Sequence, residues 1–325
     1  MGLKGFDPRW IDFPDYVLGV TKEIWEDRGI STLRRYYADD IVVRSPASVV
    51  RGNRNVIAAT MATLAEFPDR QLLGEDVIWS GSVEAGDLLS SHRILSTATH
   101  TRSGVYGEAT GKKMIYRIIA DCAARDDQIY DEWLVRDQGA IIRQMGWDAK
   151  TYATDLIQRE GGPERCVQPM TPNNDIAGPY QARGNDHPTG QRYADILSSL
   201  MRADFSVIEK SYDRACQLEL PGGATGHGWR PADEFWMGLR AAFPNAAFTI
   251  EHAIGREDPA LPARAALRWS LHGKHEGWGA FGVPTNAEVY VLGLSHAEFG
   301  PYGLRREFVL IDEIAIWKQI TLKTG

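Results

Sequence analysis

Two aspartates stand in apolar surroundings toward the ends of the two halves of the chain. Asp131 is followed at alternate positions by Trp133 and Val135, and Asp312 by two isoleucines. Because side chains alternate across a strand, each acid is expected to share a face with these apolar residues. A carboxylate on such a face loses solvation, so its pKa rises and it can serve as a general base or acid. The alternative for Asp131 is a hydrogen-bonded structural acid or an interface position.

Two histidines follow strand patterns in the same way. His100 lies seven residues after Arg93, and His275 lies seven residues after Arg268. Seven is an odd step, so on an unbroken strand the histidine and the arginine face opposite sides. The functional interpretation is a hydrogen-bond donor lining a pocket, and the alternative is a buried imidazole satisfied by the adjoining turn. The arginines are expected to face solvent or to form salt bridges.

Short motifs of the first half recur in the same order in the second half. Glu-Phe-Pro-Asp at 66–69 returns as Ala-Phe-Pro-Asn at 242–245. The offset is 176 positions there, 175 at the two Arg and His pairs, and 181 if Asp131 is paired with Asp312. Solenoid repeats have periods of roughly 20–50 residues, so a period this long indicates duplication of a whole domain.

Helical patterns come first in each half, and strand patterns follow. Helical stripes are expected at 16–24, 31–37 and 53–67, with counterparts at 193–200 and 231–243. Alternating or β-branched segments are expected to form strands at 88–99, 113–119 and 129–135, answered by 265–271, 288–294 and 308–316. Asn53 is expected to cap the third helix. Helices followed by strands predict an α+β fold.

A segment rich in Gly, Pro and Asn separates the halves. We place a first domain at 1–160, a linker at 161–190 and a second domain at 191–325. A linker of about 30 residues is long enough to let the second domain turn back on the first. We therefore expect the repeats to pack sheet to sheet as an internal pseudo-twofold pair, with further homo-oligomerisation left open.

The ordered motifs of the first half resemble the SnoaL-like polyketide cyclase family. They are a helix ending in Phe-Pro-Asp, a strand closing on Thr99-His100, a glycine-rich turn at 104–111, and Ile-x-Asp-x-Trp from Ile129 with an acid at Asp137. The resemblance covers residues 16–148 well and 190–325 more loosely. It implies two tandem cone-shaped α+β barrels of the nuclear transport factor 2 type, with helices packed on a curved, mainly antiparallel sheet.

The resemblance also implies site residues. In this family the acid on the last strand is the proposed acid/base of a cofactor-free aldol ring closure, and Asp131 matches it. Several members pair that acid with a histidine on the preceding strand, a place held by His296 beside Asp312, with Asp121 at the matching place in the first half. Chance placement is the alternative.

Further residues are expected to contact the substrate. They are Tyr36, Trp133, Asp121, His275 and Tyr212, although the two tyrosines are most simply explained as core residues of apolar helices. The second half departs from the family pattern where Ile314 and Lys318 replace Trp133 and the acid that follows it. We therefore expect the first repeat to be the better site.

Composition limits the classes of partner. A net charge of −7 gives no attraction to nucleic acid or anionic membrane, and 43% hydrophobic with 24% charged residues is ordinary for a globular protein. Three cysteines without metal-ligand spacing fit a reducing cytoplasm. We expect no metal, no cofactor and a small apolar or aromatic carbonyl ligand. A cyclase, isomerase or dehydratase, a non-catalytic binding protein and a dimerisation scaffold all remain open.

Overall fold

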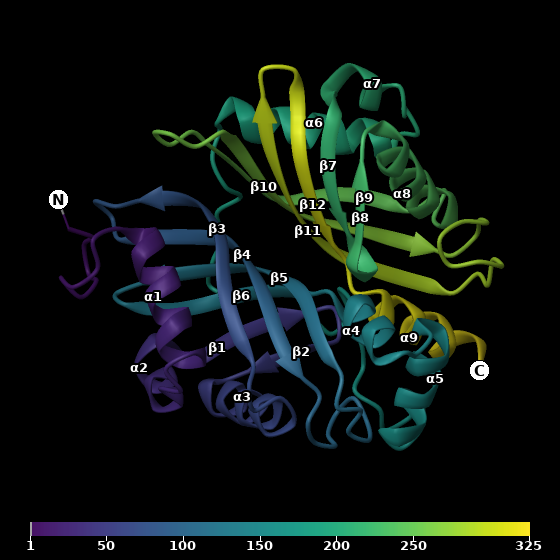
Figure 1. The fold of residues 1–325 in the computed structure, drawn as a ribbon, viewed down its shortest axis with the longest axis horizontal. Helices are drawn as coiled ribbons and strands as arrows, with labels where there is room; N and C mark the ends of the chain where they lie inside the picture. Colours follow the sequence, from purple (N-terminus) through teal and green to yellow (C-terminus); the bar gives the residue numbers. More distant parts are fainter. Residues whose placement is uncertain (1) are drawn as a thin grey trace.

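The protein contains two six-stranded sheets that face one another, each with helices on its outer side (Figure 1). The computed structural model describes residues 2–325. The two sheets have the same connectivity, and each is preceded and followed by helices. The α+β class and the tandem duplication expected from the sequence are confirmed.

The first unit occupies the first half of the chain. Its helices are α1 (Phe13–Trp25), the short 3-10 helix η1 (Ile30–Thr32), α2 (Leu33–Tyr36), α3 (Asn53–Glu66), α4 (Gln138–Met145) and α5 (Ala149–Arg159). Its strands are β1 (Tyr37–Ser45), β2 (Ser48–Arg51), β3 (Gln71–Ser82), β4 (Asp87–Thr99), β5 (Lys113–Arg125) and β6 (Gln128–Arg136), and they run in the order β2-β1-β6-β5-β4-β3.

The second unit repeats this arrangement. Its helices are α6 (Pro188–Met201), α7 (Val207–Ser211), the 3-10 helix η2 (Pro221–Gly223), α8 (Trp229–Ala242) and α9 (Glu313–Thr324). Its strands are β7 (Tyr212–Leu220), β8 (Ala224–His227), β9 (Ala247–Arg256), β10 (Ala263–Lys274), β11 (Glu288–Gly300) and β12 (Gly303–Leu310), in the order β8-β7-β12-β11-β10-β9. None of the helices between residues 2 and 325 has the length and apolar composition of a membrane-crossing segment.

Local sequence explains how the outer helices begin. The Asp12 carboxylate accepts a hydrogen bond from the Asp15 backbone N–H at 2.8 Å and caps α1, which buries a stripe on the sheet side. Gly52, at φ 85°, is the N-cap of α3, so the expectation that Asn53 caps this helix is wrong. The Asn53 side chain instead donates to the carbonyls of Leu33 and Tyr37 and ties α3 to the preceding segment.

The end of the second unit differs from the sequence expectation. The sequence predicts a strand over 308–316, but β12 ends at Leu310 and Asp312 is the N-cap of α9. The Asp312 carboxylate accepts the Ala315 backbone N–H at 3.0 Å, as the Asp137 carboxylate accepts that of Ala140 at 2.9 Å at the start of α4. Asp312 therefore corresponds to Asp137, and the expectation that it shares a strand face with apolar residues is wrong.

The inner faces of the two sheets share apolar clusters. One cluster joins Ile119 and Val135 of the first sheet to Leu292, Leu294 and Leu310 of the second unit. Another joins β3, β4 and β5 residues to Ile254 and Ala266. Each sheet is thus covered on both faces, by its own helices outside and by the other sheet inside. A buried strand residue can therefore face either the helices of its own unit or the other sheet.

Candidate functional site

A cavity of about 500 Å³ lies inside the first unit, between the outer face of its sheet and helices α1 and α3. Helix α5 and helix α9 of the second unit also contribute to its lining. The apolar part of the lining includes Val17, Val20, Ile24, Val56, Leu72, Ile94, Ile118, Ala120 and Leu134. The cavity is therefore mainly apolar, with a limited set of polar side chains in its lining.

Glu132 is the carboxylate that the last strand of the first sheet places in this cavity. On β6 it pairs with Cys122 of β5 and Val43 of β1, and all three residues line the cavity. Glu132 is 6% exposed, and its Oε2 atom has no hydrogen-bond partner. Burial raises the pKa of Glu132 to about 7, the nearby Tyr37 hydroxyl lowers it, and the charge of Asp131 raises it further. Such a carboxyl exchanges protons near neutral pH.

Ser90 and His92 line the same cavity from β4. The Ser90 Oγ atom lies 3.2 Å from Nδ1 of His92, and the imidazole is 5% exposed. Burial lowers the pKa of His92 to about 4, so this imidazole is neutral at pH 7. A neutral imidazole that carries its proton on Nε2 can donate a hydrogen bond to a ligand carbonyl.

The structure corrects the expected position of Asp131. Asp131 is fully buried, but it lies on the opposite face of β6 from Glu132, toward the second sheet, and does not line the cavity. Its carboxylate pairs with Arg44 and accepts the Tyr180 backbone N–H at 3.1 Å. A Cβ atom on Gly178 would lie 1.9 Å from the carboxylate, so the segment between the units packs directly over Asp131. The acid is an interface residue here.

Trp133 and Asp121 also lie between the sheets rather than in the cavity. The Asp121 carboxylate accepts a hydrogen bond from Nη1 of Arg268 at 2.7 Å, and both side chains are buried. The Arg268 guanidinium lies 3.7 Å from the ring centre of Trp133. Burial raises the pKa of Asp121, and Arg268 opposes this shift. The expectation that Trp133 and Asp121 line a substrate pocket is not met in this structure.

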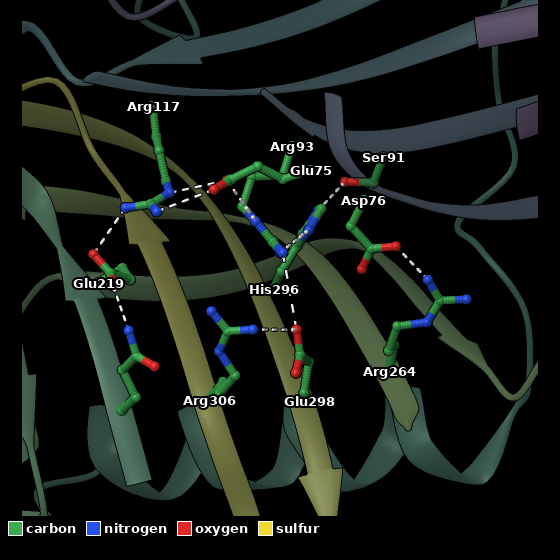
Figure 2. Close-up of polar contacts among 11 residues, drawn as sticks. Glu75, Asp76, Ser91, Arg93, Arg117, Glu219, Arg264, His296, Glu298 and Arg306 are labelled. Atoms are coloured by element: carbon green, nitrogen blue, oxygen red, sulfur yellow. Dashed lines mark hydrogen bonds and ion pairs between the residues drawn. The ribbon is translucent and has the colours of Figure 1, made fainter. Parts of the chain in front are cut away.

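His296 occupies the matching interface position from the second sheet (Figure 2). Its Nε2 atom lies 2.9 Å from Ser91 Oγ, and its Nδ1 atom lies 3.2 Å from Nη1 of Arg93. Burial and the charge of Arg93 lower its pKa. His296 therefore contacts the first unit, whereas Asp312 bonds to the first turn of α9, and the expected His296 and Asp312 acid/base pair is not formed.

The repeated histidines after the long strands are bound by turns. His100 is fully buried, with Nδ1 3.1 Å from Thr110 Oγ1 and Nε2 3.1 Å from the Glu66 carboxylate. His275 keeps the contact with Thr285 at 3.1 Å, but its Nε2 atom has no partner. Neither histidine lines the cavity of the first unit. The interpretation as a buried imidazole satisfied by the adjoining turn describes His100.

The two tyrosines have different surroundings. The Tyr36 hydroxyl donates to Glu23 at 2.8 Å and accepts from Arg9, and Tyr36 does not line the cavity. Tyr212 begins β7 as Tyr37 begins β1, so Tyr37 is its counterpart. The Tyr212 hydroxyl lies 3.0 Å from both carboxylate oxygens of Glu307. Among the nine residues expected at the site, Asp312 lines the cavity, from the start of α9.

The second unit has a glutamate at the place of Glu132. Glu307 lies 175 positions later, pairs with Ala297 of β11 and Leu218 of β7, and burial raises its pKa to about 7. Hydrogen bonds from Tyr193 at 2.9 Å, from Tyr212, and from Trp236 at 3.4 Å surround its carboxylate. This acid is held by its own unit.

Two indoles occupy the interior of the second unit. Trp236 stands at the eighth position of α8, where α3 has Thr60, and Trp269 stands 175 positions after Ile94. Thr60 and Ile94 both line the cavity of the first unit, whereas Trp236 and Trp269 are fully buried with ring centres 6.0 Å apart. A Cβ atom on Gly293 would lie 2.2 Å from the Trp269 ring, so a glycine at this point makes room for the indole.

The described residues do not form a metal site. Across residues 2–325, no group of three or more His, Cys, Asp or Glu side chains is placed to hold a metal ion. Cys122, Cys166 and Cys216 are buried and free.

Comparisons with known proteins find one family and several solved structures that resemble part of the chain. Residues 16–145 match the SnoaL-like polyketide cyclase family. Comparison with curated proteins finds no match. Solved structures similar to this chain include IdmH from Streptomyces antibioticus, at 20% identity and a TM-score of 0.35 over 41% of this chain and 97% of that one. A SnoaL-like polyketide cyclase from Agrobacterium tumefaciens is 21% identical, with a TM-score of 0.33 over 41% and 98% of the two chains. TsrD from Streptomyces laurentii is 16% identical, with a TM-score of 0.34 over 41% and 91%.

Proposed function

We propose that the first unit, whose residues 16–145 match the SnoaL-like polyketide cyclase family, is a cofactor-independent acid/base enzyme acting on an apolar carbonyl compound. Glu132 is the proposed acid/base, in place of the neighbouring Asp131. The observation that supports this assignment is the Glu132 carboxylate in a mainly apolar cavity of about 500 Å³ with one oxygen unpartnered. A carboxylate in that position can accept a proton from a bound carbon acid.

The proposed reaction begins with proton transfer to Glu132. The carboxylate takes a proton from the carbon next to a carbonyl group, and the C–H electron pair becomes the enolate. For ring closure, the enolate carbon forms a bond to a second carbonyl carbon, whose π electrons move to oxygen. The Glu132 carboxylic acid then returns its proton to that alkoxide. A pKa of about 7 suits both transfers near neutral pH.

His92 and Ser90 have a proposed supporting role. Negative charge develops on the carbonyl oxygen as the proton leaves, and a preorganised hydrogen-bond donor stabilises that charge. The neutral His92 imidazole, which lies in the same cavity with Ser90 against Nδ1, can donate from Nε2. Tyr37, which lowers the pKa of Glu132, would keep a fraction of this carboxyl ionised at neutral pH.

The second unit is proposed to be a structural partner. Its equivalent glutamate, Glu307, already accepts hydrogen bonds from three buried side chains. Trp236 and Trp269 stand at positions that line the cavity in the first unit. A carboxyl that is surrounded in this way has no access to a substrate.

Proton exchange provides a test that does not require the natural substrate. Small apolar ketones and β-diketones would be incubated with the protein in D₂O, and exchange of the protons next to the carbonyl would be followed by NMR. Loss of one positioned acid/base typically lowers the rate by a factor of about 10² to 10⁴, so we expect that loss for Glu132→Gln. Glu307→Gln is the matched control and should retain the wild-type rate.

Three outcomes distinguish the alternatives. Exchange lost in Glu132→Gln alone supports catalysis in the first unit. Exchange lost in Glu307→Gln alone would show that the site lies in the second unit and not in the first. Binding of these compounds without exchange in the wild type would favour the non-catalytic binding protein.

A further inference from the structure

Two arginines line the cavity of the first unit without a carboxylate partner. Arg70 lies between α3 and β3, and Arg136 is the last residue of β6. Among residues 2–325, no Asp or Glu oxygen lies within salt-bridge distance of either guanidinium. Most other buried arginines of this protein, such as Arg44 and Arg268, have such a partner.

Arg70 is enclosed by aromatic and hydroxyl groups. Its side chain is 1% exposed, and its guanidinium lies 4.6 Å from the Trp25 ring centre and 6.0 Å from that of Tyr116. Its Nε atom donates to Ser96 Oγ at 3.3 Å, and its Nη1 atom has no partner. Burial lowers the pKa of Arg70, and the charge of Arg136 lowers it further. The two guanidinium groups are thus close enough to repel each other.

Arg136 has an unpartnered buried atom as well. Its Nε atom makes no hydrogen bond. Tyr106 and Tyr116, which also line the cavity, are near both arginines and influence the pKa values of both. Arg136 and Arg70 therefore share one polar region of a mainly apolar cavity.

Three of the four acids that line the cavity have other partners, and the fourth is Glu132. Glu66 accepts the N–H groups of Val105 and Tyr106 at 2.9 Å and contacts His100. Asp312 accepts from the first turn of α9 and acts on Arg136 through its charge without a hydrogen bond, and Glu160 pairs with Lys318. Burying a cation is unfavourable unless an opposite charge and hydrogen bonds compensate it. The tyrosines and the charge of Asp312 raise the pKa of Arg136 and so compensate it in part, whereas burial dominates at Arg70. A bound anion would complete the compensation of both guanidinium groups.

We propose that Arg70 and Arg136 form a subsite for an oxyanion, so that the ligand of this cavity is an elongated, mainly apolar molecule with an acidic group at one end. A carboxylate fits the planar guanidinium forks, which bind such groups through paired hydrogen bonds. Glu132 and Arg136 lie four residues apart on one face of β6, which places their Cα atoms roughly 13 Å apart. The identity of the reacting end rests on the proposed function, whereas anion binding does not.

The test uses two fluorescent probes that differ in charge. Anilinonaphthalene sulfonate carries an oxyanion, and phenylnaphthylamine is its neutral counterpart, and both brighten in apolar cavities. Each would be titrated into the full-length wild type, Arg70→Met and Arg136→Met. A charged hydrogen bond contributes about 1.5–3 kcal/mol, so each substitution should weaken sulfonate binding about tenfold to a hundredfold. Binding of the neutral probe should change less than about threefold.

Two control variants test whether the probes bind in the cavity and whether the loss of any arginine would have the same effect. Thr60→Trp, which copies the second unit at Trp236, should reduce binding of both probes because it fills the cavity. Arg230→Met removes an arginine that is 89% exposed and should change neither. Equal loss of both probes in the arginine variants, or unchanged sulfonate binding, would overturn the proposal. Arg70→Gln and Arg136→Gln repeat the test if a Met variant does not fold.

The outcome is independent of catalysis. Glu132→Gln should abolish proton exchange and leave the preference for the anionic probe in place. If exchange is absent in the wild type while the anionic preference is lost in Arg136→Met, the proposed function fails and the oxyanion subsite stands. If exchange occurs but the arginine variants bind both probes as the wild type does, the subsite fails and the proposed function stands.

Discussion

Glu132 and Glu307 occupy the same position on the sixth strand of their sheets, 175 residues apart, and both are buried with pKa values raised to about 7. They differ in what surrounds them. Glu132 has an unpartnered oxygen in a cavity, whereas Glu307 accepts hydrogen bonds from Tyr193, Tyr212 and Trp236. Both units therefore have this glutamate, but only in the second unit is its carboxylate surrounded by hydrogen-bond donors.

The first prediction concerns the pH dependence of stability. The pKa of Glu132 rises from 4.5 to about 7 on folding, so the folded state binds its proton more tightly than the unfolded state. The resulting stabilisation is present below pH 4.5 and is lost as the pH rises to 7. It amounts to on the order of 3 kcal/mol for each such group. Glu132→Gln and Glu307→Gln should therefore raise Tm at pH 8 relative to wild type and leave it nearly unchanged at pH 5.

Thermal denaturation by circular dichroism across this pH range measures the effect. Asp12→Asn, in an exposed helix cap, is a control for removal of a carboxylate without deep burial. A constant difference in Tm between each Gln variant and wild type at all pH values would contradict the linkage.

The second prediction separates Asp131 from catalysis. Asp131→Asn removes one of the two carboxylates that pair with the buried Arg44 guanidinium, and Asp175 remains at 2.8 Å, so the loss should be that of a charged hydrogen bond, about 1.5–3 kcal/mol. The rate of proton exchange at saturating substrate should stay within about threefold of wild type, because Asp131 faces away from the cavity. Urea denaturation and the D₂O assay give the two readouts. A variant that is stable but inactive would restore Asp131 as the acid/base.

The third prediction compares the interiors of the two units. Trp236→Ala should cost about 3–5 kcal/mol because it removes a fully buried indole. Thr60→Ala, at the same helix position in the first unit, should cost less than about 1 kcal/mol because Thr60 already borders a cavity. Added indole should raise the Tm of Trp236→Ala by occupying the space that the substitution leaves. Equal losses for the two variants would show that the second unit is no more filled than the first.

Much of the fold could be predicted from the sequence because the repeat carries its own evidence. The offset of 175 at Arg93 and Arg268 reflects two sheets with the same topology, and the change from helical to alternating patterns predicts α+β. The same offset, continued to the end of each unit, pairs Glu132 with Glu307 and Asp137 with Asp312. Pairing Asp131 with Asp312 requires an offset of 181, which departs from the offset of 175 and assigns Asp312, a helix N-cap, to a strand.

The orientation of the last strand could not be read from its sequence. Asp131, Trp133 and Val135 alternate with Glu132 and Leu134, and both sets are mainly apolar with one acid. Alternation identifies a buried face only when the other face is exposed to water, and here helices cover one face while the second sheet covers the other. A shift of one residue exchanges the two faces. The cavity face follows from long-range packing of the repeats.

The last prediction concerns two equivalent polar contacts between the sheets. Arg268 forms an ion pair with Asp121 of the first sheet, and Arg93 forms a hydrogen bond with His296 of the second sheet at the matching position. Asp121 forms an ion pair with Arg268, whereas burial and Arg93 keep the pKa of His296 low, so the imidazole is neutral. Arg268→Met should therefore cost about 3–5 kcal/mol by leaving a buried carboxylate alone, and Arg268→Met with Asp121→Asn should recover much of that loss.

The Arg93→Met and His296→Gln cycle should show a smaller coupling, about 1.5–3 kcal/mol for a charged hydrogen bond. Urea denaturation of the single and double variants measures both couplings, and equal values would show that the interface does not distinguish the carboxylate from the imidazole.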